Sequence, residues 1–300
     1  MKLLHKGDII RIVAPARAIT EDELMSSVHF LQEQGYQVEF GDHLFCRHHQ
    51  FAGTDAERTA DFQDALDTER VKVVWCARGG YGCLRIIDRL DFSKFALAPK
   101  WVCGYSDVTV FHTYINSILR QPSLHAIMPV NVQGSEAAFG SLRTMLSALE
   151  TGEVSYTVAV HPLNRTGEAK GELCGGNLSV LYAVNGSVSD LNTDGKILFI
   201  EDLDEYLYHI DRIMMCLKRS GKLENLSGLV VGGMEDMHDN AIAYGKSVEE
   251  IIWEHVEEYQ YPVCFGFPAG HIPDNRALIL GGTSMLKVTK EHVQFQIRAT

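Results

Sequence analysis

Residues 71–77 of the 300-residue chain read Val-Lys-Val-Val-Trp-Cys-Ala, and this nearly unbroken apolar run decides the fold. A strand with one solvated face alternates apolar and polar residues, whereas an unbroken run is typical of a parallel strand buried on both faces. Largely apolar runs also lie upstream at residues 9–14 and downstream at residues 101–104, and residues 38–40 are expected to be a short strand. We therefore expect these four segments to be strands of one parallel sheet.

Helical segments separate these strands, as a parallel sheet requires. Thr20 with Glu23, and Thr54 with Glu57, form the Thr-x-x-Glu pattern of a capping box, which predicts the start of a helix. Further helices are expected at residues 82–90, 107–119 and 136–149, and one more strand at 126–130. The alternation predicts an α/β fold with a Rossmann-like, doubly wound parallel sheet over residues 1–150. The functional side chains of such a sheet lie at the carboxyl ends of its strands.

The composition changes near Thr151, and residues 164–170 are polar and contain glycine. We therefore expect a linker at residues 151–170 and a second, β-rich α/β domain at residues 171–300. The helices expected in this domain are 178–184, 204–219 and 248–259. Its expected strands are 197–200, 229–231, 277–280, 285–288 and 293–297.

The formal net charge of −12 argues against two classes of partner. An acidic protein is repelled by phosphate backbones and by anionic lipids, so we expect no nucleic acid and no membrane partner. No apolar run approaches the roughly 18 residues that span a bilayer. The seven cysteines are odd in number and form no C-x-x-C pair. Reduced thiols and an N-terminus without a secretory apolar stretch indicate a cytoplasmic protein.

The strongest local signal for chemistry is Trp101-Val-Cys-Gly-Tyr-Ser-Asp107, where a buried strand ends and a helix follows at once. A serine at such a sharp turn exposes its hydroxyl above the sheet, and the first amides of the helix favour negative charge beside it. Ser106 is therefore a candidate nucleophile. The alternative is an ordinary helix N-cap serine, which the motif alone favours.

A serine nucleophile needs a base and an orienting carboxylate. His271 is the candidate base, because two glycines and two prolines fix the loop at residues 266–275 after an apolar run. A loop histidine bonded to backbone is an equally good interpretation. Glu201 and Asp202 follow the apolar strand at residues 197–200, where an unpaired carboxylate is costly. Either could orient the base, and a surface acidic cluster is the alternative.

Residues 77–82, Ala-Arg-Gly-Gly-Tyr-Gly, form a glycine-rich turn at the end of a strand. The turn lacks the Lys-Ser/Thr of a phosphate-binding loop and does not fit G-x-G-x-x-G, so a nucleotide site is poorly supported. Its backbone amides could approach an oxyanion closely, or the segment could be a simple tight turn.

Three other groups are weaker candidates for a site. His48 and His49 have no partner at metal-ligand spacing, and the spacing of Asp236, His238 and Asp239 is not diagnostic of a metal site. Cys103 lies inside the strand at residues 101–104 and is expected in the core. We expect no metal and no cofactor.

Taken together, these segments resemble the LD-carboxypeptidase family, the S66 serine peptidases, which includes muramoyltetrapeptide carboxypeptidases and microcin-immunity peptidases. The resemblance covers nearly the whole chain through the order and spacing of its motifs. These motifs are residues 12–16, 51–55, 77–82, 104–107, 175–178, 199–202 and 270–271.

The resemblance implies a catalytic triad in the order Ser106, Glu201 and His271, which selects Glu201 over Asp202. It also implies an oxyanion hole made by the backbone amides of Asp107 and Gly80. For substrate binding the candidates are Arg78, as a cationic contact for a terminal carboxylate, and Gly79.

The family's activity is the release of a terminal D-alanine from a muropeptide tetrapeptide during peptidoglycan recycling. The resemblance further implies an active site between two domains and a homodimer. Two alternatives stay open, namely a peptidase acting on a peptidyl-nucleotide and a non-catalytic muropeptide-binding protein. Residues 125–129, His-Ala-Ile-Met-Pro, depart from the His-Gly-Pro-Met that the family often carries, so substrate preference carries over less safely than the triad.

Overall fold

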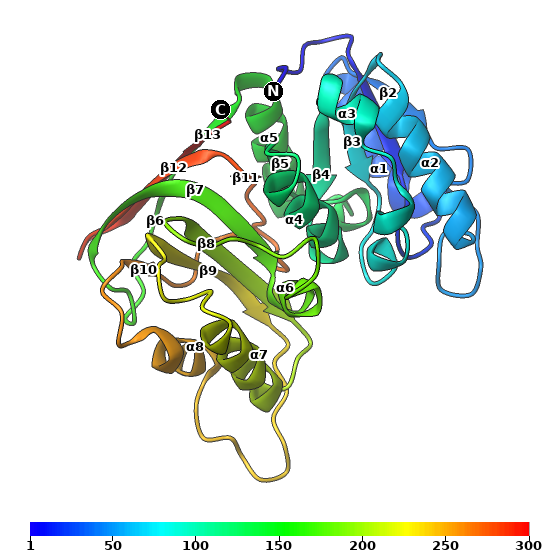
Figure 1. The fold of residues 1–300 in the computed structure, drawn as a ribbon. Coiled ribbons are helices and arrows are strands. Elements are labelled where there is room, and N and C mark those ends of the chain that lie inside the picture. The colour runs from blue at the N-terminus through cyan, green and yellow to red at the C-terminus, as the bar shows by residue number, and fades with distance from the viewer. Residues whose placement is uncertain (300) are drawn as a thin grey trace.

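The computed structural model describes residues 1–299 and contains two sheets with helices packed around them (Figure 1). The first sheet has the strand order β11-β5-β4-β3-β1-β2. Its strands are β1 (Ile9–Val13), β2 (Gln37–Phe40), β3 (Val71–Cys76), β4 (Trp101–Gly104), β5 (Ser123–His125) and β11 (Leu278–Leu280). All neighbours are parallel except β11, which runs antiparallel to β5. The run at residues 71–77 is thus a central parallel strand, as expected.

Helices cover both faces of this sheet, which confirms the doubly wound α/β fold. They are α1 (Glu21–Glu33), α2 (Asp55–Asp67), α3 (Ser93–Leu97), α4 (Thr109–Ser117) and α5 (Glu136–Thr151). Apolar residues of α1 and α5 share one buried cluster, and those of α2 and α4 share the cluster on the opposite face. Both predicted capping boxes are present, at Thr20 and Thr54.

Two local predictions were wrong. Residues 126–130 are not a strand, because β5 ends at His125 and the buried run that follows turns into a 3-10 turn at Pro129–Asn131. Residues 82–90 form two 3-10 turns, Cys83–Arg85 and Ile87–Arg89, in place of a helix. The amide of Cys83 donates to the Asp107 side chain, so the start of this segment is tied to a neighbouring turn.

The second sheet has the order β10-β9-β8-β7-β12-β13-β6. Its strands are β6 (Glu153–Val158), β7 (Gly167–Asn177), β8 (Ile197–Leu203), β9 (Gly228–Glu235), β10 (Val263–Cys264), β12 (Thr283–Val288) and β13 (Val293–Arg298). Strands β7 to β10 are parallel, and β7, β12, β13 and β6 are antiparallel. The helices are α6 (Leu178–Val184), α7 (Leu207–Arg219) and α8 (Val248–Val256).

The structure does not divide cleanly at the boundary expected near Thr151. Residues 151–170, expected as a linker, contain β6 and the first residues of β7, and both strands belong to the second sheet. From the C-terminal half, β11 joins the first sheet beside β5 (Figure 1). The division into residues 1–150, 151–170 and 171–300 stays a prediction.

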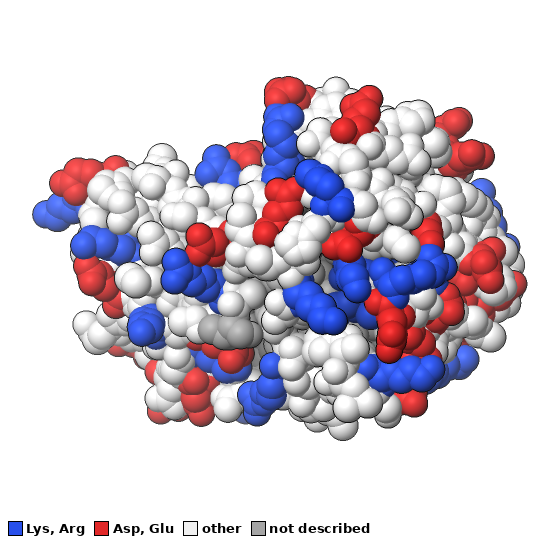
Figure 2. All heavy atoms as spheres, turned by 90° about the horizontal axis from the view of Figure 1, so that it is seen from above, with Lys and Arg blue, Asp and Glu red and all other residues white. Residues whose placement is uncertain are grey.

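Charge is mixed on the face seen from above (Figure 2). On the face in Figure 2, Lys and Arg side chains lie next to Asp and Glu side chains over much of the surface. Among residues 1–299, no helix combines the length and apolarity needed to cross a membrane.

Candidate active site

The turn after β4 places Ser106 in a strained backbone conformation. Its φ is +64°, a left-handed value that residues other than glycine seldom adopt. The turn continues as a 3-10 turn at Ser106–Val108 and then as α4. The side chain of Ser106 caps neither helical segment, so the N-cap alternative does not describe what the hydroxyl does. This geometry is typical of a serine that a sharp strand-to-helix turn holds out of the sheet.

The glycine-rich turn lies directly against Ser106. A Cβ added to Gly79 would lie 3.0 Å from Ser106 Cβ and 3.1 Å from Ser106 Oγ, so glycine allows this close approach without displacing the serine. Gly80 follows with a φ of +102°, which also favours glycine. Within residues 1–299, no protein acceptor receives the backbone N–H of Gly80. A free amide thus lies one residue from the contact with the serine hydroxyl.

Asp107 holds the two turns together through its side chain. Its Oδ2 accepts a hydrogen bond of 2.8 Å from the Cys83 amide, at the end of the glycine-rich turn. Burial raises the pKa of the Asp107 carboxyl, although the hydrogen bond from Cys83 opposes this. The backbone of Asp107 therefore follows the serine while its side chain fixes the opposite turn.

His271 is paired with Glu201 at the carboxyl end of β8. The Nδ1 of His271 lies 2.6 Å from Glu201 Oε2, and the backbone N–H of His271 donates to the same oxygen at 3.1 Å. Glu201 is fully buried. Burial lowers the pKa of His271, but the charge and hydrogen bond of Glu201 outweigh it, so the pKa lies above its ordinary value. Because a carboxylate only accepts, Nδ1 carries the proton and Nε2 is free to act as a base.

Asp202 points to different partners. It accepts hydrogen bonds from Asn177 Nδ2, from the amide and hydroxyl of Ser179 and from the amide of Leu203. Burial, followed by the charge of Glu201, raises the pKa of Asp202 to about 6. Of the two acidic residues that the sequence left open, Glu201 is the one beside the histidine.

Tyr105 brings the serine turn and the histidine together. Its ring lies 4.6 Å from the His271 ring, centroid to centroid, so the imidazole packs on the residue that precedes Ser106. His125 lies on another side of Tyr105, at 5.7 Å, and against Phe199 at 4.9 Å. His125 is buried, and burial lowers its pKa well below the ordinary value, which favours the neutral imidazole. Sequence reasoning assigned no role to Tyr105, although the residue stands inside the Gly-Tyr-Ser-Asp motif.

The remaining candidates lie apart from this cluster or are already paired. Arg78 Nη1 lies 3.2 Å from Glu23 Oε1 and 3.3 Å from the Ala18 carbonyl. His238 Nε2 lies 2.6 Å from Asp204 Oδ1, and residues 1–299 contain no group of three or more ligating side chains suited to a metal ion. Burial raises the pKa of the Cys103 thiol well above its ordinary value, which makes it a poor nucleophile.

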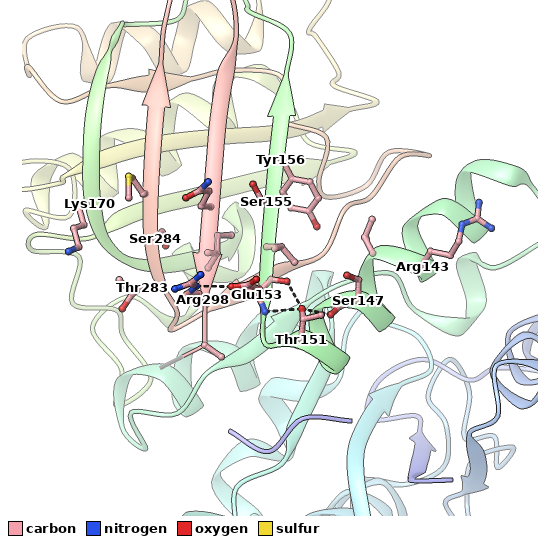
Figure 3. Close-up of a pocket in the computed structure, with 16 residues that line it drawn as sticks. Arg143, Ser147, Thr151, Glu153, Ser155, Tyr156, Lys170, Thr283, Ser284 and Arg298 are labelled. Carbon is pink, nitrogen blue, oxygen red and sulfur yellow. Dashed lines mark hydrogen bonds and ion pairs between the residues drawn. The ribbon is translucent and has the colours of Figure 1, made fainter. Parts of the chain in front are cut away.

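Two cavities bear on the location of the site. A cavity of about 310 Å³ is lined by Tyr105, Asn131, His271 and Asn275 among others, and so opens beside the imidazole. A larger one of about 810 Å³ lies between the end of α5 and strands β6, β7, β12 and β13 (Figure 3). The larger cavity contains none of the candidate residues, so volume alone does not identify the active site.

The chain belongs to the LD-carboxypeptidase family and is a peptidase. Residues 10–126 match the model for the LD-carboxypeptidase N-terminal domain, and residues 170–286 match the model for the LD-carboxypeptidase C-terminal domain. A probable murein peptide carboxypeptidase of Bacillus subtilis (strain 168) is 34% identical over 293 residues, covering 97% of this chain and 92% of that protein.

One further relative is similar to this chain in sequence, and one solved structure has the same fold. The murein tetrapeptide carboxypeptidase of Pseudomonas aeruginosa (strain PAO1) is 28% identical over 93% of this chain and 92% of that protein. The crystal structure of a muramoyltetrapeptide carboxypeptidase from Oxalobacter formigenes superposes with a TM-score of 0.88 and 29% identity, covering 97% of this chain and 98% of that one.

Proposed function

We propose that the protein is a serine carboxypeptidase that cleaves an L,D-peptide bond and releases the terminal D-alanine of muropeptide tetrapeptides. One observation carries this proposal: the Glu201–His271 pair, 2.6 Å apart, packs through Tyr105 against the left-handed turn of Ser106. A nucleophile, a base and an orienting carboxylate are the parts that acyl transfer through a serine requires. The names of the relatives supply the substrate class.

The proposed reaction proceeds through an acyl-enzyme. Nε2 of His271 takes the Ser106 proton as the hydroxyl attacks the carbonyl, and then gives it to the nitrogen of the departing D-alanine. Water attacks the resulting ester with the same imidazole as base, which frees the tripeptide and restores Ser106. Glu201 keeps the proton on Nδ1 and stabilises the imidazolium that forms at each stage.

The backbone amides of Asp107 and Gly80 are the proposed oxyanion hole. Among residues 1–299 the Gly80 N–H has no protein acceptor, and the Asp107–Cys83 hydrogen bond fixes the separation of the two turns. One such donor typically contributes about 10²–10³-fold in rate. Gly79 leaves the space through which the carbonyl reaches Ser106, which is its proposed part in substrate binding.

We also propose that the enzyme works in the cytoplasm, as a homodimer, in peptidoglycan recycling. All seven cysteines are free, and five of them are buried, which suits a reducing compartment. Light scattering coupled to size-exclusion chromatography measures the proposed dimer directly, and a monomeric mass at micromolar concentration rules it out.

A comparison of three substrates tests the proposed function. We expect purified enzyme to release D-alanine from a tetrapeptide with an L,D-terminal bond, and to leave the L,L-diastereomer and a peptidyl-adenylate intact. Faster cleavage of the peptidyl-adenylate supports the microcin-immunity alternative. Binding of the tetrapeptide without any turnover supports the non-catalytic alternative.

A further inference from the structure

An arginine that no sequence motif indicated lies on the far side of the glycine-rich turn from Ser106. A Cβ added to Gly80 would lie 2.5 Å from Cδ and 2.9 Å from Nε of Arg17, so the Arg17 side chain occupies the space that glycine leaves open. The Arg17 amide donates to the Gly79 carbonyl at 3.3 Å. Gly79 in turn contacts Ser106, so one turn of backbone separates the Arg17 side chain from the serine hydroxyl.

The charge of Arg17 is available to a ligand. Arg17 is solvent-exposed, and its guanidinium makes no ion pair or side-chain hydrogen bond within the described chain, residues 1–299. It lines a cavity of about 600 Å³ together with Arg47, Arg78 and Glu23. Arg78 is engaged by Glu23 at 3.2 Å, and Arg47 Nε donates to the His49 carbonyl at 3.2 Å. Among the three arginines of this cavity, Arg17 is thus the one whose side chain packs on Gly80 and has no side-chain partner within residues 1–299.

We propose that the Arg17 guanidinium binds the terminal carboxylate of the residue that the enzyme releases. In a carboxypeptidase substrate that carboxylate is one residue from the scissile carbonyl, and consecutive Cα atoms are about 3.8 Å apart. Arg17 contacts Gly80, the residue whose amide is a proposed oxyanion donor, so its side chain lies next to the turn at which the scissile carbonyl would bind. A guanidinium binds a carboxylate through two parallel hydrogen bonds, which fixes both its position and its orientation.

This inference rests on the proposed function, and a cycle of enzyme and substrate changes tests it. The probes are an L,D-tetrapeptide with a free terminal carboxylate and the same peptide with a terminal carboxamide. For Arg17→Ala we expect kcat/KM on the free acid to fall roughly 10- to 100-fold, mainly through KM, because a hydrogen-bonded charge pair is lost. On the carboxamide, Arg17→Ala should stay within about threefold of the wild-type enzyme, because that pair is absent already.

Two matched variants separate recognition from damage. Arg17→Lys should recover part of the lost selectivity, and Arg47→Ala, which removes the same charge from the same cavity, should stay within about threefold on both peptides. The assignment is overturned if Arg17→Ala lowers kcat/KM equally on both peptides, or if Arg47→Ala and not Arg17→Ala removes the selectivity. A wild-type enzyme that cleaves both peptides equally well also ends it, while leaving the peptidase function intact. A wild-type enzyme that releases no D-alanine ends the proposed function first.

Discussion

At the scale of single residues, the backbone of Ser106 is the feature most closely tied to chemistry. A left-handed φ in a residue other than glycine costs on the order of 1–3 kcal/mol and persists only where the surroundings enforce it. Gly79 on one side and the buried Asp107 on the other supply that constraint. The Ser106 hydroxyl is not used as a helix cap, which agrees with the proposal that it is the nucleophile.

The His271–Glu201 pair predicts how activity depends on pH. The proposed base, His271, must be neutral to accept a proton. Glu201 holds the pKa of His271 above its ordinary value, so wild-type kcat/KM should rise with pH through that raised pKa. Glu201→Gln removes the charge while burial remains, and burial alone lowers the imidazole pKa. We therefore expect the acid limb of the profile to move to lower pH, while the plateau falls roughly 10²–10⁴-fold.

A pH profile of kcat/KM for the two enzymes checks this prediction. Asp202→Asn is the matched comparison, because Asp202 makes no hydrogen bond to the histidine and its charge raises the pKa of His271 less than Glu201 does, so its acid limb should move less than that of Glu201→Gln. If the acid limb of Glu201→Gln coincides with that of the wild-type enzyme, another group controls the ionisation.

At the scale of elements, the contact between two turns sets the geometry of the proposed oxyanion hole. The Cys83 amide has Asp107 Oδ2 as its acceptor, so Asp107→Ala leaves a buried donor unpaired. We expect the free energy of unfolding to fall by about 1–3 kcal/mol and kcat to fall with it, because the Gly80 amide loses its fixed position.

Asp107→Asn provides the matched comparison. Its side-chain oxygen still accepts from Cys83, and burial already disfavours the charge of Asp107, as the direction of its pKa shift shows. Denaturant titrations and initial rates should therefore give the Asp107→Asn variant a free energy of unfolding and a kcat close to those of the wild-type enzyme. Equal losses for the Ala and Asn variants would show that the carboxylate charge, and not the hydrogen bond, is what matters.

The sequence predicted the elements better than the contacts between them. Capping boxes at Thr20 and Thr54 and the apolar run of β3 are local signals, and the structure confirms each of them. Residues 126–130 were predicted to be a strand because they are apolar. They form a loop covered by other parts of the chain, and a buried loop can be as apolar as a strand. Glu201 and Asp202 could not be distinguished by the residues themselves, since their partners come from distant segments. Arg17 belongs to no motif and contacts the glycine turn only through the fold.

At the scale of the whole molecule, the site depends on how the two sheets are joined. The hydroxyl of Thr109, on the helix that follows Ser106, accepts a 3.0 Å hydrogen bond from the Asn177 amide. Asn177 pairs in register with Glu201, and its side chain donates to Asp202. One buried contact therefore links the serine half of the chain to the half that carries the histidine and its carboxylate.

Thr109→Val tests this link, because valine has nearly the same shape as threonine but lacks the hydroxyl. The buried Asn177 amide loses its acceptor. We therefore expect the free energy of unfolding to fall by about 1–3 kcal/mol and kcat to decrease. Thr113→Val on the same helix removes a hydroxyl that bonds only to the Val110 carbonyl, and should cost less and leave kcat unchanged. Chemical denaturation together with kcat measures both. Comparable kcat for the two variants would mean that the Thr109 contact does not hold the site together.

The rate of D-alanine release by Ser106→Ala, measured on an L,D-tetrapeptide, tests the proposed nucleophile most directly. Removing the hydroxyl should lower the rate by about 10³-fold or more, with a free energy of unfolding within about 1 kcal/mol of the wild-type value, because only the attacking oxygen is lost. A folded Ser106→Ala enzyme that keeps more than about a tenth of the wild-type rate would show that another group attacks the peptide bond.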